Sequence, residues 1–225
     1  PEQGIGDEVM FASVLHELES FEKNSLQSQI TLVCDKRLVE LFNRSFEFLT
    51  AIPKDPEHSY HHLDNKIDYW IFNGSLPKFF RHTCEDFNAP IPYLRANENS
   101  YKEWKNRYNL LNHKINIGIS WRGGLEAKSR ADRSLDLDQL LPVLTKASQN
   151  ANLINLQYGE HTREIEEFTK RSGIPIHDWE DSNPLKDVES FSAQIKALDL
   201  VITIDNSTAH FAGALGKKTQ VMLPF

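Results

Sequence analysis

The feature that most limits the fold of this chain is a regular alternation of strand-like and helix-like runs in its second half. Short apolar, β-branched runs alternate with amphipathic stretches that have a helical spacing. Such an alternation builds a parallel sheet with right-handed crossovers. We therefore expect a Rossmann-like domain here. The expected strands are residues 115–120, 152–157, 174–179, 200–205 and 219–224, and the expected helices are 136–147, 163–173, 190–198 and 207–216.

The first half shows the same alternation more weakly. The glycine turn GIGD at residues 4–7 leads into a helical stretch, and residues 29–34 are apolar enough for a buried strand. A helix is expected next, at 36–46, and a second strand at 69–72. The Pro- and Asn-rich segment 88–112 is expected to be an irregular linker.

These patterns predict an α/β chain of two Rossmann-like domains. The first would span residues 1–100 and the second residues 101–225. Both ends look cut, because only three residues precede Gly4 and no helix follows the last expected strand.

Composition excludes some partners. The net charge of −7 and the pI near 5.7 argue against a surface that gathers nucleic acid or anionic lipid. No apolar run approaches the roughly 20 residues that a membrane span needs, and the first residues lack a signal-peptide pattern. We expect a cytoplasmic protein in which Cys34 and Cys84 are reduced and structural.

The strongest candidate site is the segment DLVITIDNSTAHFAGALGKK at residues 199–218. An apolar strand ends there in a polar turn that opens a helix, and helix starts at the carboxyl edge of such sheets bind anions. An ordinary capped turn between strand and helix is the alternative reading. The candidate residues are Asp205, the possible N-cap residues Asn206, Ser207 and Thr208, and His210, a possible phosphate donor.

A second candidate is the basic loop SWRGGLEAKSRADRSLDL, which leaves the expected strand at 115–120. It should lie at the same sheet edge as the Asp205 turn, and arginine forks fit phosphate oxygens. A phosphate site and a solvated basic loop both remain possible. Its basic residues are Arg122, Lys128, Arg130 and Arg133.

The third candidate is Asp7 in the GIGD turn, where Gly4 and Gly6 permit close backbone approach. Its carboxylate could cap the following helix or act as a general base. Other motifs fail: GIGDEV lacks the third glycine of a dinucleotide fingerprint, and GALGKKT closes a helix instead of opening one. The histidines at 58, 61 and 62 fit a hydrated loop better than a metal site.

Together these segments resemble a known family. GIGDEVMFASVL, GSLPKFF, IPYLRAN, ISWRGG with RSLDL, LQYGE, and DLVITIDNSTAHFAGALGKKTQVMLPF are similar, in this order, to segments of bacterial heptosyltransferases and TPR-associated glycosyltransferase domains. The resemblance covers nearly the whole chain, and its last segment is highly specific. It implies the GT-B architecture, in which two Rossmann-like domains face each other.

The resemblance also implies roles for individual residues. Asp7 matches the general base, and Gly4 and Gly6 match the glycines that shape its turn. Arg122, Lys128 and Arg130 have no firm counterpart in the family, while heptosyltransferases carry a lysine at the Arg133 position. The residues that match the donor side are Ser120 and Arg133 in the loop, Glu160 near the ribose, and Asp205, Asn206, Ser207 and His210 at the diphosphate.

The function implied is inverting, metal-independent transfer of a sugar from a nucleotide-sugar donor, with no further cofactor. The acceptor would be a glycan, a lipid-linked sugar or a protein, and a TPR array in the same parent chain is a possible partner. A nucleotide-sugar epimerase of the same architecture and a non-catalytic glycan- or peptide-binding module remain alternatives, because a fold does not determine a function.

Overall fold

A computed structural model describes residues 4–24, 29–54, 67–87, 92–113, 115–123 and 134–223 of the chain. The chain divides into two compact units, Pro1–Arg95 and Ala96–Phe225. Three basic residues of the candidate loop, Lys128, Arg130 and Arg133, lie outside the described residues, as does the histidine cluster at 58–62.

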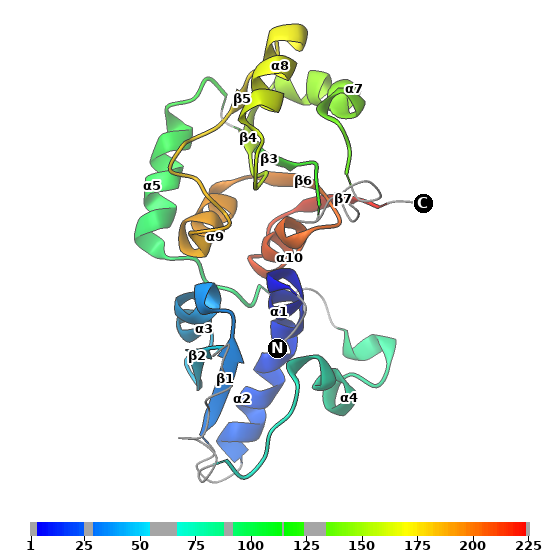
Figure 1. The fold of residues 1–225 in the computed structure, drawn as a ribbon. Helices are drawn as coiled ribbons and strands as arrows, with labels where there is room; N and C mark the ends of the chain where they lie inside the picture. Colours follow the sequence, from blue (N-terminus) through cyan, green and yellow to red (C-terminus); the bar gives the residue numbers. More distant parts are fainter. Residues whose placement is uncertain are drawn as a thin grey trace. The chain divides into compact units, whose positions relative to one another are not determined.

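The first unit contains a parallel pair of strands (Figure 1). β1 (Ile30–Cys34) pairs with β2 (Leu49–Pro53), with Ile30 opposite Leu49 and Cys34 opposite Pro53. The strand predicted at residues 29–34 is thereby confirmed. The helical elements of this unit are α1 (Ile5–Phe11), η1 (Ala12–Val14), α2 (Leu15–Asn24), η2 (Lys36–Leu38), α3 (Val39–Ser45), η4 (Asn73–Ser75), α4 (Pro77–Phe80) and η5 (Cys84–Asp86).

The strand predicted at residues 69–72 is wrong. This run belongs to no strand, and Tyr69 and Trp70 are 94% and 76% exposed. β1 pairs instead with β2, where the buried Leu49 and Ala51 alternate with a more exposed residue between them. The aromatic run has the composition of a strand, but strand propensity reflects burial against neighbours, which this run lacks.

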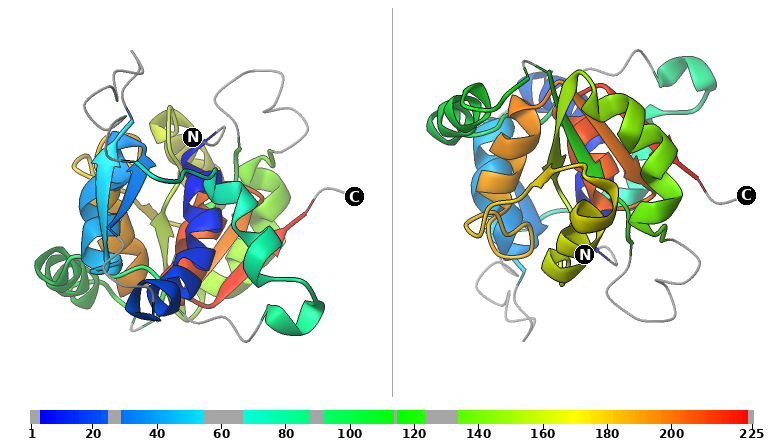
Figure 2. Two further views of the ribbon diagram at one scale, coloured as in Figure 1. Left: turned by 90° about the horizontal axis from the view of Figure 1, so that it is seen from below. Right: turned by 90° about the horizontal axis from the view of Figure 1, so that it is seen from above.

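The second unit contains a five-stranded parallel sheet with helices on both faces (Figure 2). Its strand order is β5-β4-β3-β6-β7, so the alternation predicted from the sequence is confirmed, although β5 has only two residues. The elements are α5 (Glu98–Asn109), β3 (Ile115–Ser120), α7 (Leu137–Ser148), β4 (Ala151–Asn155), α8 (Thr162–Ser172), β5 (Ile176–His177), α9 (Val188–Ala197), β6 (Leu200–Ile204), α10 (Ser207–Ala214) and β7 (Thr219–Met222).

The irregular linker predicted at residues 88–112 is wrong, because α5 occupies its second half. The Asn97 side chain caps this helix by accepting two backbone N–H groups of the first turn. Trp104 and Tyr108, one turn apart, are buried, and the Trp104 indole N–H donates to Ser190 Oγ of α9 at 3.1 Å. The aromatic pair at i and i+4 gives this polar segment the apolar face that a packed helix needs.

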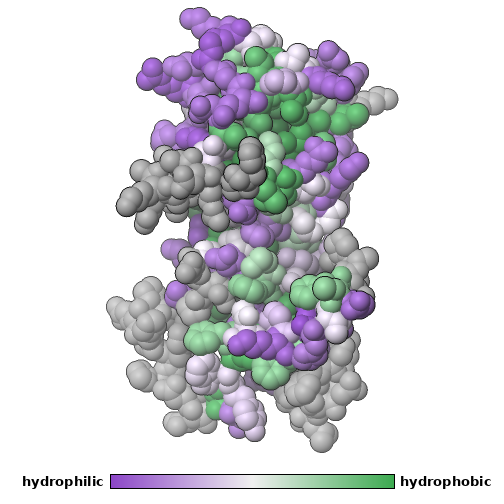
Figure 3. All heavy atoms as spheres, turned by 90° about the vertical axis from the view of Figure 1, so that its right-hand side faces the viewer, coloured by the Kyte–Doolittle hydropathy of each residue, from purple (hydrophilic) through white to green (hydrophobic). Residues whose placement is uncertain are grey.

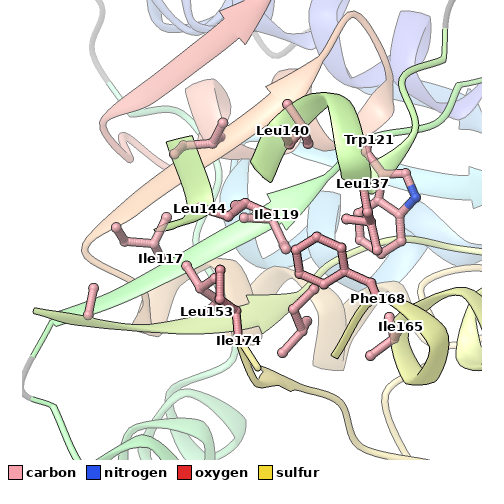
Figure 4. Close-up of a cluster of buried hydrophobic side chains, with 13 residues drawn as sticks. Ile117, Ile119, Trp121, Leu137, Leu140, Leu144, Leu153, Ile165, Phe168 and Ile174 are labelled. Carbon is pink, nitrogen blue, oxygen red and sulfur yellow. The ribbon is translucent and has the colours of Figure 1, made fainter. Parts of the chain in front are cut away.

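One hydrophobic core cluster of this unit lies between the sheet and the helices α7 and α8 (Figure 4). Side chains from β3 and β4 meet those of the two helices there, and Trp121 closes the end of the cluster. The residues labelled in the figure are Ile117, Ile119, Trp121, Leu137, Leu140, Leu144, Leu153, Ile165, Phe168 and Ile174.

The strand order creates a switch point in the sheet. The chain passes from β3 through α7 to β4 on one side, and from β6 through α10 to β7 on the other, although β3 and β6 are neighbours. Right-handed crossovers in opposite directions place α7 and α10 on opposite faces. The loops that leave β3 and β6 therefore diverge, and in open α/β sheets ligands bind in the crevice at such a point.

Hydrophobic side chains also reach the surface between hydrophilic ones, as the side shown in Figure 3 illustrates. Exposed large apolar residues of the second unit include Leu141 and Val143 of α7 and Val221 of β7. Within the described sheet, β7 is the strand at one edge, and it pairs with β6.

Gly118, in the middle of β3, is expected to tolerate no side chain. A Cβ at this position would lie 2.5 Å from Cδ1 of both Leu156 and Leu198, which are almost fully buried. Gly118→Ala should therefore lower the free energy of unfolding by about 1–3 kcal/mol through overpacking. Denaturant titration measures this change. Gly213→Ala is the control, because apart from its chain neighbours and the backbone of its own helix no atom lies within 4 Å of the added Cβ. An equal loss in both variants would contradict the overpacking argument.

Candidate functional site

A buried polar network around Asn206 joins the carboxyl ends of β3 and β6. Asn206 is 8% exposed and caps α10: its Oδ1 accepts from the Thr208 backbone N–H at 2.9 Å and from Thr203 Oγ1 at 3.1 Å. Its Nδ2 donates to Ser120 Oγ at 2.9 Å and to the Arg122 backbone carbonyl at 3.2 Å. Asn206 thus links the two strand ends at the switch point, and two of the predicted site features share one sheet edge.

Gln157, which follows β4, forms the second half of this network and was not predicted from the sequence. The side chain is 2% exposed, and its Oε1 accepts from the backbone N–H groups of Trp121 at 3.0 Å and Arg122 at 2.8 Å, and from Ser120 Oγ at 3.3 Å. Its Nε2 donates to the carbonyls of Arg122 and Tyr158. A glutamine at the end of an apolar strand-like run was the available signal.

The start of α10 is the capped helix N-terminus that the sequence predicted, and its role as an anion site stays a prediction. Ser207 and Thr208 begin the helix after the Asn206 cap, at the carboxyl end of β6. The first-turn N–H groups and the helix dipole favour a negative ligand at such a place. Thr208 is fully buried, and its hydroxyl has no hydrogen-bond partner among the described residues, while Asp205 and His210 are half-buried.

An open pocket of about 280 Å³ lies at the ends of β3 and β4, where α8 begins. The Arg122 guanidinium pairs with the Glu164 carboxylate at 3.2 Å and donates to the Glu160 backbone carbonyl. The Trp121 indole N–H donates to the other Glu164 oxygen at 2.7 Å. These contacts hold the Arg122 side chain against the residues that line the pocket. A contact between Arg122 and a phosphate group stays a prediction. The pocket is lined by Arg122, Glu160, His161, Arg163, Glu164 and Glu167.

His161 closes one side of the pocket. Its Nδ1 lies 2.6 Å from the Gly159 carbonyl oxygen and its Nε2 lies 3.0 Å from Asp178 Oδ2. The hydrogen bond to Asp178 raises the pKa of His161 above its ordinary value. Burial disfavours ionisation of Asp178, but hydrogen bonds from His161 and Asn155 hold the Asp178 pKa below its ordinary value. The structure thus favours an imidazolium–carboxylate pair beside the predicted ribose residue, Glu160, whose side chain is exposed.

In the first unit, Asp7 lies in the first turn of α1 and is half-buried. Its Oδ2 accepts from the Gly4 backbone N–H at 3.1 Å, so the carboxylate caps the helix start. The tight glycine turn predicted here is wrong, because Gly4 has an extended backbone (φ −152°) and Gly6 already lies inside the helix. An ordinary residue could adopt the Gly4 conformation.

The adjacent Glu8 is a buried carboxyl that was not predicted from the sequence. It is 8% exposed, and its Oε2 accepts from the Asp35 backbone N–H at 2.7 Å. Burial raises the pKa of Glu8. Glu8 therefore ties α1 to the end of β1, next to the carboxylate predicted to be the base.

The described part of the chain offers little for other kinds of site. It holds no group of three or more His, Cys, Asp or Glu side chains that could bind a metal ion. Cys34 is a buried free thiol and Cys84 an exposed one. Among the described helices, none combines the length and apolar character that crossing a bilayer requires.

Comparison with known proteins places this geometry in a structural class. The chain superimposes on E. coli ADP-heptose lps heptosyltransferase II with a TM-score of 0.62 and 14% identity, covering 96% of this chain and 81% of the other. It superimposes on a glycosyl transferase family 9 protein from Veillonella parvula with a TM-score of 0.67 and 10% identity, covering 99% of this chain and 79% of the other. The fold is that of GT-B-like glycosyltransferases. The structure of E. coli heptosyltransferase WaaC with ADP has the same fold: its TM-score is 0.58 at 9% identity, and the match covers 97% of this chain and 84% of the other.

Sequence comparison adds one relative. The chain is 28% identical over 224 residues to Protein FlbA of Caulobacter vibrioides, covering 96% of this chain and 37% of FlbA. It therefore spans little more than a third of that relative. No protein-family model matches the chain. At these identities the solved structures establish the fold, while the chemistry has to be argued from the site.

Proposed function

We propose that the protein is a glycosyltransferase that moves a sugar from a nucleoside-diphosphate sugar to an acceptor hydroxyl. The observation that carries the proposal is the link between Asn206 and Ser120 at the switch point of a GT-B-like fold, directly before the start of α10. This link holds the N-terminus of α10 at the sheet edge where α/β proteins bind ligands. The relatives in fold are glycosyltransferases, and one of them, the heptosyltransferase WaaC, is a complex with ADP.

On the donor side, the start of α10 would hold the diphosphate. Its first-turn amides and dipole supply positive potential, and Ser207 and His210 are half-buried in its first turns. Arg133 would add a charge-assisted contact, and Glu160 would bind the ribose. In this scheme the protein itself balances the diphosphate charge, so transfer is metal-independent.

On the acceptor side, Asp7 would act as the general base. Its carboxylate would take the proton of the acceptor hydroxyl while that oxygen forms a bond to the anomeric carbon. The bond from the anomeric carbon to the diphosphate oxygen breaks at the same time, and the diphosphate leaves with the electron pair. Attack opposite the leaving group inverts the anomeric configuration. The acceptor classes proposed are a glycan, a lipid-linked sugar or a protein, for an enzyme that works in the cytoplasm and is joined to a TPR array.

The proposal predicts that nucleoside diphosphates bind without metal and that Arg133 contributes to the binding. Arg133→Ala should weaken nucleoside-diphosphate binding by about ten- to a hundredfold, because a charge-assisted contact is lost. Binding of the free nucleoside should hardly change. Calorimetry with ADP, UDP and GDP, each with and without EDTA, on the full-length protein measures this.

Arg171→Ala is the matched control, since Arg171 pairs with Asp138 at the surface, on the last turn of α8. Loss of binding on chelation, or equal losses for nucleoside and diphosphate, would contradict the donor assignment. Chemical change of a nucleotide-sugar in the absence of any acceptor would indicate an epimerase. Binding without any turnover across glycan, lipid-linked and protein acceptors would indicate a non-catalytic module.

A further inference from the structure

The loop between β4 and α8 is held by two basic side chains that contact consecutive backbone carbonyls. The Gly159 carbonyl lies 2.6 Å from Nδ1 of His161, and the Glu160 carbonyl accepts from the Arg122 guanidinium. Gly159 has a positive φ of 77°, the left-handed conformation that favours glycine, so the chain reverses sharply here. The position of Glu160 in the pocket thus depends on both side chains.

The geometry of His161 identifies its charge state. Nδ1 faces a carbonyl oxygen and Nε2 faces a carboxylate oxygen of Asp178, and both of these groups only accept hydrogen bonds. A neutral imidazole has one N–H, so it can satisfy only one of the two. The imidazolium satisfies both, and the direction of the His161 pKa shift agrees.

Asp178 is itself fixed in place. Asn155 Nδ2 donates to Asp178 Oδ1 at 2.8 Å, and Asn155 Oδ1 accepts from the Gln157 backbone N–H at 2.8 Å. The clamp that His161 forms with Gly159 and Asp178 therefore connects the ends of β4 and β5 with the start of α8, which His161 precedes. It is continuous with the polar network at the switch point.

We infer that His161 is a positioning residue for the donor: the imidazolium, clamped between Gly159 and Asp178, fixes the loop that presents Glu160, and its deprotonation loosens nucleotide binding. This inference rests on the proposed function. His161 itself touches the loop and Asp178, so it acts through Glu160 and is not a catalytic group.

Several charged groups favour or oppose protonation of His161 to the imidazolium. Asp178 after β5 favours the imidazolium, and Arg122 after β3 opposes it. The start of α8, which His161 precedes, also opposes a positive charge. The remaining charged side chains around the pocket come from α8 and the residue before His161, and they are Glu160, Arg163, Glu164 and Glu167.

The sign of the pH effect follows. Because the pKa of folded His161 lies above its ordinary value of 6.5, the clamp is complete below that pH. Its contribution to stability and to loop position is lost as the pH rises through the raised pKa. Nucleoside-diphosphate affinity should fall over the same range by about three- to tenfold, which corresponds to losing one hydrogen bond.

Two variants test this. His161→Gln should show no such fall in ADP, UDP or GDP affinity, and its affinity should equal that of the wild type at high pH. Asp178→Asn should lower the pKa of His161, observed by ¹⁵N NMR of the imidazole, and should move the fall in affinity to lower pH. His113→Gln, the same substitution before the start of β3, should leave the wild-type profile unchanged and corrects for titration of the nucleotide itself.

Three results would overturn the inference: a single protonated ring nitrogen in His161 below pH 6.5, an unchanged His161 pKa in Asp178→Asn, or the same affinity profile in His161→Gln and wild type. The backbone NMR signals of Gly159 and Glu160 should follow the His161 titration even without ligand. If no nucleotide binds at any pH, the proposed function fails and the donor role of His161 fails with it. The NMR titration then separately decides whether the clamp itself exists.

Discussion

Asp7→Asn is expected to lower turnover by about 10²- to 10⁴-fold in the active, full-length protein, with donor affinity almost unchanged. Asparagine keeps an oxygen that can accept from the Gly4 backbone N–H, so the cap on α1 is preserved. What is lost is the ability to take a proton. Steady-state kinetics with saturating donor, together with calorimetry of donor binding, separates these two effects.

Asp86→Asn is a matched control in the same unit. Asp86 also lies in the first turn of a short helix, and its Oδ2 accepts from the backbone N–H groups of His82 and Thr83, both at 2.8 Å. It shares the capping role of Asp7 and has no proposed catalytic role, so its turnover should stay near wild type. If both variants keep full turnover, Asp7 is a helix cap only.

Glu8 provides a second comparison, because it is the neighbouring carboxyl and burial raises its pKa. Its side chain already accepts from the Asp35 backbone N–H. A large loss of turnover in Glu8→Gln with normal turnover in Asp7→Asn would transfer the role of base to Glu8 and overturn the assignment made from the resemblance.

The sheet of the second unit could be predicted, because the local sequence of its strands agrees with the way the strands pack. The strands are short, largely apolar runs. Asn206 lies between β6 and α10, and its cap on α10 is a contact with a residue two positions along the chain. The partners of that same side chain across the sheet could not be predicted. Ser120 lies 86 positions away in the sequence, and only the strand order β3-β6 brings the two together.

Two segments could not be predicted, residues 69–72 of the first unit and α5 of the second, because composition and packing disagree in both. The aromatic residues at 69–72 suit a strand, but nothing in the local sequence says whether a neighbouring strand will bury them. The segment around α5 has the opposite character: its average composition is polar, and only Trp104 and Tyr108 mark the buried face. In both cases the contact that decides the structure lies far away in the sequence.

Gln157 is the site residue with the weakest signal in the sequence, and its removal is expected to cause the largest loss of stability. Gln157→Ala should lower the free energy of unfolding by about 2–4 kcal/mol, because buried backbone groups lose their partners. Its Oε1 accepts from the N–H groups of Trp121 and Arg122, and its Nε2 donates to two carbonyls. Denaturant titration with a constant m-value measures the change.

Two further variants show whether hydrogen bonding or volume is responsible. Gln220→Ala makes the same truncation at an exposed position of β7 and should change stability by less than about 0.5 kcal/mol. Gln157→Glu keeps the volume but, when ionised, turns an oxygen toward the carbonyls of Arg122 and Tyr158. Burial should raise the pKa of the new carboxyl, so the unfolding free energy of this variant, relative to wild type, should recover as the pH falls and the carboxyl becomes a donor. A Gln157→Glu variant as stable as wild type at neutral pH would show that Gln157 fills space and does not hold the ends of β3 and β4 together by hydrogen bonds.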